Sequence, residues 1–209
     1  MSRIPYITAE NFTNAQKQLC DRITGGKRSR GRSLESFFTH EGGLRGPFNA
    51  FLYHPVIGEA AQRLGEVLRF EGVLSAPLRE LAILTVAAKW EAHYEWWAHE
   101  KIGRKIGLDD RVINSLKAGE DPDFDDPDQR LVFEFCRELM GTGRISDRRY
   151  AKAADLLGEA GVVELVFLLG YYTTVAMILN VFEIPLPAGE QTPFPEGGHE
   201  SQDTRGGRK

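Results

Sequence analysis

The residues best suited to proton transfer lie in one stretch of ten residues, 91–100, with the sequence EAHYEWWAHE. This stretch holds two histidines, three carboxylates, one tyrosine and two tryptophans. It follows an apolar segment, 78–88, that carries one carboxylate of its own, Glu80. Burial beside apolar walls moves the pKa of a titratable group toward neutral pH. The composition of this region therefore indicates acid–base chemistry.

Helical spacing reduces the stretch to a few candidates. Glu95 and His99 are four residues apart, so they share one face of a helix. His99 is the best general acid or base, because an unperturbed imidazole has a pKa of ~6.5. Glu80 belongs to the preceding predicted helix, and the fold would have to bring it close. Either Glu80 or Glu95 could then orient the imidazole.

Plainer interpretations exist for the same region. Glu95 and His99 could form only an exposed pair, worth roughly a few tenths of a kcal/mol. The basic run 27–32 is expected to be a solvated loop, with anion capture or a subunit contact as the alternative. His93 and His99 are six residues apart and do not share a helix face, so we predict no metal site.

Composition predicts one ordinary globular domain, with tails, in the cytoplasm. The 209 residues are 42% hydrophobic and 27% charged, which is typical of a soluble domain with a full core. A net charge of −4 gives no reason to expect nucleic-acid binding. No uninterrupted apolar run reaches the ~20 residues that span a membrane. Cys20 and Cys136 are far apart, which argues against a disulfide scaffold or a structural zinc site.

The hydrophobic periodicity predicts an all-α fold, because no alternating run bounded by turn residues indicates a strand. The helix over 75–88 is apolar around most of its circumference, so we expect it at the centre of the fold. In the helix that begins at Pro55, the spacing predicts a buried stripe of Val56, Ala60, Leu64, Val67 and Leu68. The remaining predicted helices cover 10–23, 47–53, 92–106, 109–118, 131–140, 146–157 and 162–182.

Three regions follow from this pattern. Residues 1–33 are predicted to form an N-terminal helix and a basic, glycine-rich connector. Residues 34–187 form the main helical domain. Residues 188–209 are polar and rich in glycine, which is typical of a disordered tail or an arm.

Several separated segments resemble the carboxymuconolactone decarboxylase family, whose other branch is the AhpD-like alkylhydroperoxidases. The likeness covers roughly residues 45–187, and the segments follow the order of the family. They are 46–55 (GPFNAFLYHP), 79–84 (RELAIL), 94–99 (YEWWAH), 170–180 and 184–187 (IPLP). The resemblance implies an AhpD-like helical bundle, assembly into a homo-oligomer (dimer, trimer or hexamer) and a role in the catabolism of aromatic compounds.

The peroxidase branch of this family uses a glutamate followed by C-x-x-C-x-x-x-H. The glutamate and histidine correspond to Glu80 and His99, while the two cysteine positions hold Ala92 and Glu95. Peroxide reduction of this kind requires a thiolate nucleophile. Thiol peroxidase chemistry is therefore not expected here, and a carboxylate occupies one of the thiol positions.

The decarboxylase branch works on a small lactone carboxylic acid without a metal or an organic cofactor. The resemblance thus implies a lyase in which His99 donates or accepts a proton, while Glu80 and Glu95 orient it or bind substrate. Arg45 could bind a substrate carboxylate through a two-pronged hydrogen bond. The other predicted substrate-binding residues are aromatic or lie in the matched upstream segment: Tyr94, Trp96, Tyr171, Tyr172, Asn49 and His54.

Two alternatives to a decarboxylase remain open from the sequence. The same pocket could catalyse an isomerisation, a hydration or a ring opening, which the absence of carbon dioxide release would reveal. The protein could also bind a small molecule without catalysis, having lost the chemistry of the family together with its thiols. A near-normal pKa of His99 in an open site would favour that second alternative.

Overall fold

The computed structural model describes residues 2–195, and all eight of the longer elements in this range are α-helices. The all-α prediction is confirmed. Short 3-10 turns at Ala9–Asn11, Lys27–Ser29 and Leu34–Phe37 complete the elements. The helices are α1 (Asn14–Gly25), α2 (Phe48–Tyr53), α3 (Pro55–Phe70), α4 (Ala76–Lys89), α5 (His93–Lys105), α6 (Asp110–Ala118), α7 (Pro127–Thr142) and α8 (Asp147–Val181).

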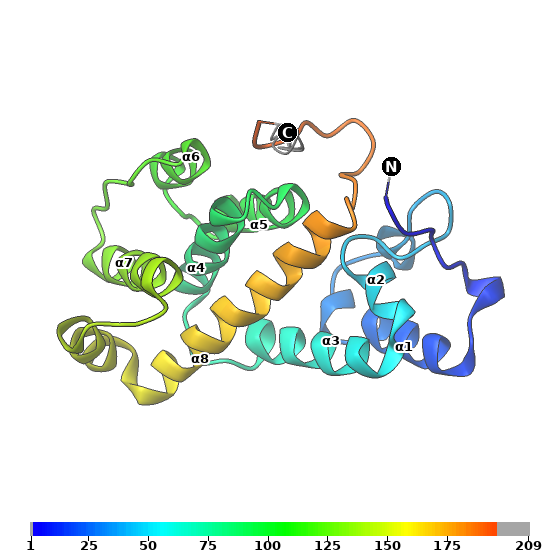
Figure 1. Ribbon diagram of the computed structural model, residues 1–209, viewed down its shortest axis with the longest axis horizontal. Helices are drawn as coiled ribbons and strands as arrows, with labels where there is room; N and C mark the ends of the chain where they lie inside the picture. The colour runs from blue at the N-terminus through cyan, green and yellow to red at the C-terminus, as the bar shows by residue number, and fades with distance from the viewer. Residues whose placement is uncertain (1, 196–209) are drawn as a thin grey trace, which may run out of the picture.

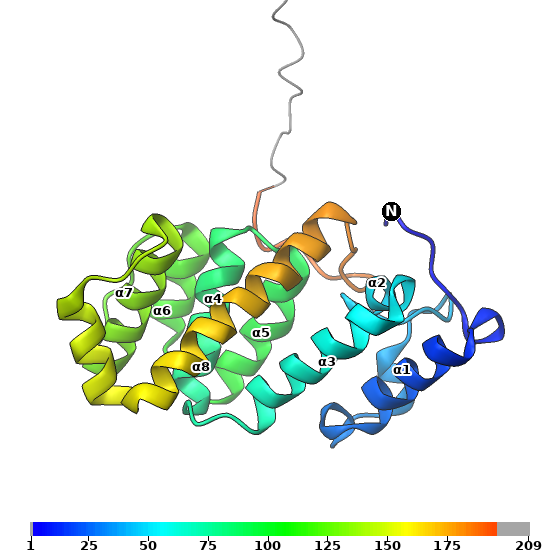
Figure 2. The same ribbon diagram turned by 60° about the horizontal axis from the view of Figure 1, so that its bottom comes forward.

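Helix α4 is the central element, as its apolar circumference predicts. Every residue from Glu80 to Ala87 is buried, and α4 packs against α5, α7 and α8. Helices α4 to α7 lie on one side of α8, and α1 to α3 lie on the other side (Figures 1 and 2). Helix α8 therefore lies between the two groups of helices. Residues on α8 and on its neighbour α5 are within reach of the N-terminal part of the chain.

Helix α8 consists of two helical segments joined at a kink. Gly158 has non-helical backbone angles, with φ of 68° and ψ of 166°, which a glycine adopts without steric cost. The two predicted helices, 146–157 and 162–182, correspond to the segments on either side of it. The helix is long and apolar enough to cross a membrane by length and composition, but half of its most apolar window is buried inside the fold.

Helix α3 buries only part of the predicted stripe. Leu68 is buried and Leu64 packs against the core, but Val56 and Ala60 are exposed. The other buried positions of α3 are Gly58, Gln62 and Gly65. A Cβ atom on Gly65 would collide with the hydroxyl group of Tyr171 from α8. The prediction was wrong for Val56 and Ala60 because this part of α3 requires close approach rather than bulk.

The chain after α8 folds back over α5 instead of leaving the molecule. Phe194 is buried, and its ring lies against Trp96 with a centroid distance of 5.2 Å. Glu190 pairs with Lys101 of α5 at 2.7 Å. Residues 188–195, predicted as part of a polar tail, are thus anchored by an aromatic contact and an ion pair. The rest of the predicted tail, 196–209, lies outside the described residues.

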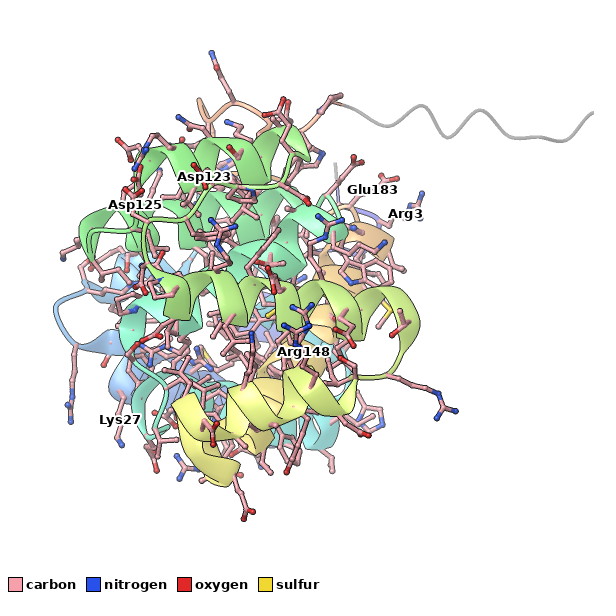
Figure 3. The ribbon with its side chains drawn as sticks, turned by 90° about the vertical axis from the view of Figure 1, so that its left-hand side faces the viewer. Arg3, Lys27, Asp123, Asp125, Arg148 and Glu183 are labelled. Carbon is pink, nitrogen blue, oxygen red and sulfur yellow. The ribbon has the colours of Figure 1, made fainter. Side chains whose placement is uncertain are left out.

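The N-terminal segment is attached to the end of α8. Figure 3 shows Arg3 and Glu183 side by side, and their side chains form an ion pair at 2.6 Å. The backbone N–H of Arg3 also donates to the carbonyl of Phe182 at 2.9 Å. These contacts hold the segment that precedes α1 against the part of the chain that supplies the tyrosines of the site.

Candidate functional site

A buried histidine–carboxylate pair joins α4 to α5. His99 Nδ1 lies 2.6 Å from Glu80 Oε2, and both side chains are buried. A carboxylate only accepts hydrogen bonds, so Nδ1–H of His99 donates and fixes the tautomer of the ring. The chain reverses between the two helices at Glu91, whose φ is 46°. This turn brings Glu80 opposite His99, although 19 residues separate them in the sequence.

The surroundings of the pair lower both pKa values. Burial raises the pKa of Glu80, but the charge and hydrogen bond of His99, together with Arg69 and Arg79, outweigh it and leave the pKa below its usual value. Burial lowers the pKa of His99, and the charges of Arg69 and Arg28 add to this effect against the pull of Glu80. The pair is therefore an ionised carboxylate and a neutral imidazole at neutral pH. His99 Nε2, which makes no hydrogen bond within residues 2–195, remains available as a base.

Glu95 is the second carboxylate of the site, and its environment is the opposite of that around Glu80. It is only 2% exposed, and neither of its oxygens has a hydrogen-bond partner among residues 2–195. Burial raises its pKa well above the usual value, which favours the neutral acid form of the side chain. Two titratable groups on one face of α5 thus favour opposite roles, a base at His99 and an acid at Glu95.

A cavity of about 430 Å³ opens beside these groups, and both Glu95 and His99 line it. Three predicted tyrosines, Tyr94, Tyr171 and Tyr172, form part of its wall, and Arg45 lines it as well. The rings of Tyr172 and His99 meet edge to face with a centroid distance of 5.1 Å. Burial raises the pKa of Tyr94 to about 12, so its hydroxyl group is neutral at neutral pH and donates hydrogen bonds. The structure therefore brings these predicted residues together around one cavity.

Three predicted substrate-binding residues lie elsewhere and stabilise the fold. Trp96 is completely buried, and its indole N–H donates to Glu100 at 2.9 Å. Asn49 is also buried, where its side chain bonds the backbone of Pro5 and Ile7. His54 is exposed at the N-terminus of α3, where its ring accepts a hydrogen bond from the backbone N–H of Ile57. None of the three lines the cavity.

Three arginines that we did not predict from the sequence also line this cavity. Arg28 and Arg32 come from the basic connector, and Arg69 comes from the C-terminal end of α3. The basic run had indicated anion capture only as an alternative to a solvated loop. Arg69 carried no signal in the sequence, since an isolated arginine on an amphipathic helix is ordinary. Together with Arg45, they make the cavity strongly cationic.

Thiol and metal chemistry find little support in the described residues. Cys20 and Cys136 are buried free thiols, and burial raises the pKa of Cys20 to about 11. Burial also raises the pKa of Cys136, so neither side chain is a thiolate at neutral pH. No group of three His, Cys, Asp or Glu side chains within residues 2–195 has the arrangement to hold a metal ion.

The fold and site define an all-α protein with a histidine–carboxylate pair, a buried neutral acid and an arginine-lined cavity. Comparison with protein-family models and with curated proteins finds no match for this chain. Its function must therefore be inferred from the site itself.

Proposed function

We propose that this protein is a cofactor-independent acid–base enzyme, a lyase that decarboxylates a small carboxylated lactone or a related ring compound. The observation that carries the proposal is the buried pair of Glu80 and His99, of which His99 lines a cavity of about 430 Å³. Pairing with an ionised carboxylate holds the imidazole in one tautomer and stabilises its protonated form during a reaction. The cavity volume suits a small cyclic molecule.

The groups around the cavity match the steps of a decarboxylation. When the bond to the departing carboxyl carbon breaks, its electrons remain on the ring compound, and a proton must neutralise them. In our proposal His99 takes up a proton from solvent at Nε2 and gives it to this carbon as carbon dioxide leaves, and Glu95 is a further donor in the same space. Arg45 binds a carboxylate of the substrate, and the tyrosines limit the access of water.

We also propose that the protein forms a homo-oligomer through α8. An exposed apolar stripe supports this part of the proposal, because large apolar patches on a surface mark contacts. At 3.6 residues per turn its members fall on one side of the helix, and each is more than 40% exposed: Val163, Val166, Phe167, Met177 and Val181. Sedimentation of the protein and of Phe167→Asp tests it, and identical masses at the size of a monomer would contradict it.

The enzymatic proposal is tested by incubating the protein with a panel of small cyclic carboxylic acids and measuring carbon dioxide release. We expect turnover of at least one compound by the natural protein and by His40→Gln, whose side chain is exposed and does not line the cavity. We expect little turnover by His99→Gln. Turnover without carbon dioxide would replace the decarboxylase with an isomerase, hydratase or ring-opening enzyme. Full activity of His99→Gln would refute the mechanism altogether.

A further inference from the structure

The side chain of Glu95 has no partner within the fold. It is buried, and neither of its two oxygens makes a hydrogen bond to any group within residues 2–195. It also takes part in no ion pair in this range, unlike its neighbours Glu80 and Glu100. A buried carboxyl group without hydrogen bonds is costly, because it has lost its contact with water without replacing it. Both oxygens are therefore free to bind a further group.

These free oxygens belong to the wall of the cavity and not to the packed core. Glu95 lines the cavity of about 430 Å³, in which His99 also lies. Glu80 and Glu95 are the buried carboxylates within residues 2–195. Glu80 is held by His99 at 2.6 Å, so its hydrogen bond is made inside the protein. The hydrogen bonds of Glu95 are left to a ligand in the cavity.

The arginines of the cavity do not supply the missing partner. None of them forms an ion pair with Glu95 or with any other carboxylate of residues 2–195: Arg28, Arg32, Arg45 and Arg69. Burial raises the pKa of Glu95 without the opposing effect of nearby cations that Glu80 shows. The guanidinium groups are thus free for an anionic part of a ligand, whereas Glu95 faces a neutral part.

The chemistry of a neutral carboxyl group determines what fits it. Its hydroxyl oxygen donates a hydrogen bond and its carbonyl oxygen accepts one, side by side. The complementary group has an acceptor next to a donor, as the C=O and N–H of a cis amide have. An open chain disfavours the cis form, but a small ring imposes it. A lactone has only the acceptor, so it leaves one oxygen of Glu95 without a partner.

The spacing on α5 limits the size of the ligand. Glu95 and His99 are four residues apart, which places them ~6 Å apart along the helix axis. A ring of five or six atoms with its substituents is about that wide, so one ring reaches both side chains. Tyr172 packs against His99 at 5.1 Å and against Tyr171 at 5.2 Å, which gives the cavity an aromatic wall beside the imidazole. Such a wall suits the face of a small ring.

We infer that the cavity binds a cyclic amide, whose C=O and N–H pair with the carboxyl group of Glu95 while the other side of the ring lies against His99. This inference rests on the proposed function, because it narrows the ring compound that the lyase accepts to a lactam acid. The pairing at two atoms also fixes the orientation of the ring. Glu95 thus determines which ring carbon lies beside His99 Nε2.

Calorimetric titration of the full chain tests the inference with four matched ring acids. The probes are γ-butyrolactam-β-carboxylate, its N-methyl derivative, γ-butyrolactone-β-carboxylate and β-proline, which carries an ammonium group in place of the amide. We expect the lactam to bind at least about fivefold more tightly than the others, because each of those leaves an oxygen of Glu95 unpaired. Equal affinity for lactam and lactone, no binding of the lactam, or tightest binding of β-proline would overturn the inference.

Two variants of Glu95 and one control assign the preference to this side chain. Glu95→Met removes both hydrogen-bonding positions at similar length, so it should bind lactam and lactone alike. Glu95→Gln keeps a donor beside an acceptor and should retain the preference for the lactam. Glu91→Met is the control, since Glu91 is exposed next to α5 and does not line the cavity. A preference that persists in Glu95→Met, or that Glu95→Gln or Glu91→Met abolishes, would refute the role of Glu95.

Failure of this inference is separable from failure of the proposed function. Carbon dioxide release is measured on ring acids in matched lactam and lactone forms. A protein that prefers the lactam probe through Glu95 but decarboxylates no ring acid would refute the lyase and support the binding inference. Decarboxylation of a lactone acid as efficient as that of the matching lactam would support the lyase and refute the assignment of a cyclic amide.

Discussion

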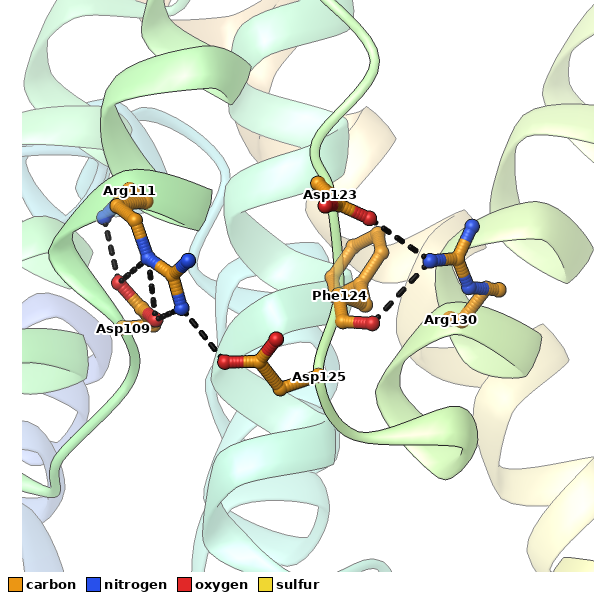
Figure 4. A network of polar contacts seen from close by, with 6 residues as sticks. All are labelled: Asp109, Arg111, Asp123, Phe124, Asp125 and Arg130. Carbon is orange, nitrogen blue, oxygen red and sulfur yellow. Dashed lines mark hydrogen bonds and ion pairs between the residues drawn. The ribbon is translucent and has the colours of Figure 1, made fainter.

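The arginines on the surface of α6 and α7 and those in the cavity differ in whether a carboxylate is paired with them. On the surface, Arg111 lies between Asp109 and Asp125, with 2.6 Å to each carboxylate (Figure 4). Arg130 pairs with Asp123 at 3.0 Å and also bonds the carbonyl of Phe124. In the cavity, four arginines have no such partners within the described residues. The acidic loop before α7 thus neutralises its own neighbours, whereas the cavity retains its positive charge for a ligand.

The contrast shows why total charge says little about this protein. The net charge of −4 predicts no affinity for anions, yet the charges are segregated. On the surface, carboxylates pair with arginines such as Arg111 and Arg130, and water screens each pair. Inside the cavity, screening is weaker and an uncompensated guanidinium attracts an anion strongly. The local arrangement of charges, and not the net charge, determines which ligand the cavity attracts.

Replacing the base of the site should have the largest effect. We expect His99→Gln to lower kcat/KM by roughly 10²–10⁴, because general acid–base catalysis contributes about that factor. Arg111→Gln, on the α6–α7 surface, should leave kcat/KM unchanged. Steady-state kinetics on the substrate found by the panel makes the comparison. A similar loss in both variants would mean that the two regions do not differ in function.

Replacing the neutral acid should stabilise the protein in a pH-dependent way. In the unfolded chain Glu95 ionises above its ordinary pKa, but in the folded protein its raised pKa keeps it protonated. Raising the pH therefore favours unfolding of the natural protein by about 1.4 kcal/mol per pH unit, and Glu95→Gln removes this term. Urea unfolding between about pH 5 and pH 7 should show a growing advantage of the variant. A constant difference would mean that Glu95 is ionised in the fold.

Filling the close contact between α3 and α8 should have a moderate effect. A Cβ on Gly65 would lie 2.8 Å from Arg28 Nη2 and collide with Tyr171. We expect Gly65→Ala to cost about 1–3 kcal/mol of stability through overpacking. Gly170→Ala is the control, since nothing lies within 4 Å of its Cβ position and alanine favours helix. Thermal unfolding and calorimetry should separate the two variants.

Removing a surface arginine should have the smallest effect. Arg111→Gln breaks two exposed ion pairs, which water and salt already weaken. We expect a free energy of unfolding close to that of the natural protein, measured by urea unfolding. A large loss of stability would contradict the interpretation of these ion pairs as screened surface contacts.

Local patterns in the sequence were sufficient to predict the helices and the residues that share one face of the site. The apolar circumference of 75–88 predicts the buried position of α4, because a helix without a polar face can only be stable in a core. The spacing of Glu95 and His99 predicts that they line the same wall, since four residues make about one helical turn. Both conclusions depend only on the geometry of a single helix.

Contacts between distant segments could not be predicted in this way. Trp96 and Asn49 carry side chains suited to ligands, yet the former packs on Phe194 and the latter bonds Pro5 and Ile7. Nothing near either residue in the sequence indicates those partners. Val56 and Ala60 fit a buried stripe, but they are exposed, and the close contacts of α3 are made at Gly58 and Gly65.

The sequence by itself determined that the protein is all-α and that an acid and a base share one face of α5. The tertiary structure alone decided which carboxylate holds His99, and that arginines from the connector and from α3 enter the same cavity. The physical reason is that the two kinds of property depend on residues at different distances along the chain. Helix periodicity is a property of neighbouring residues, while the charge and burial of a cavity depend on every segment that surrounds it.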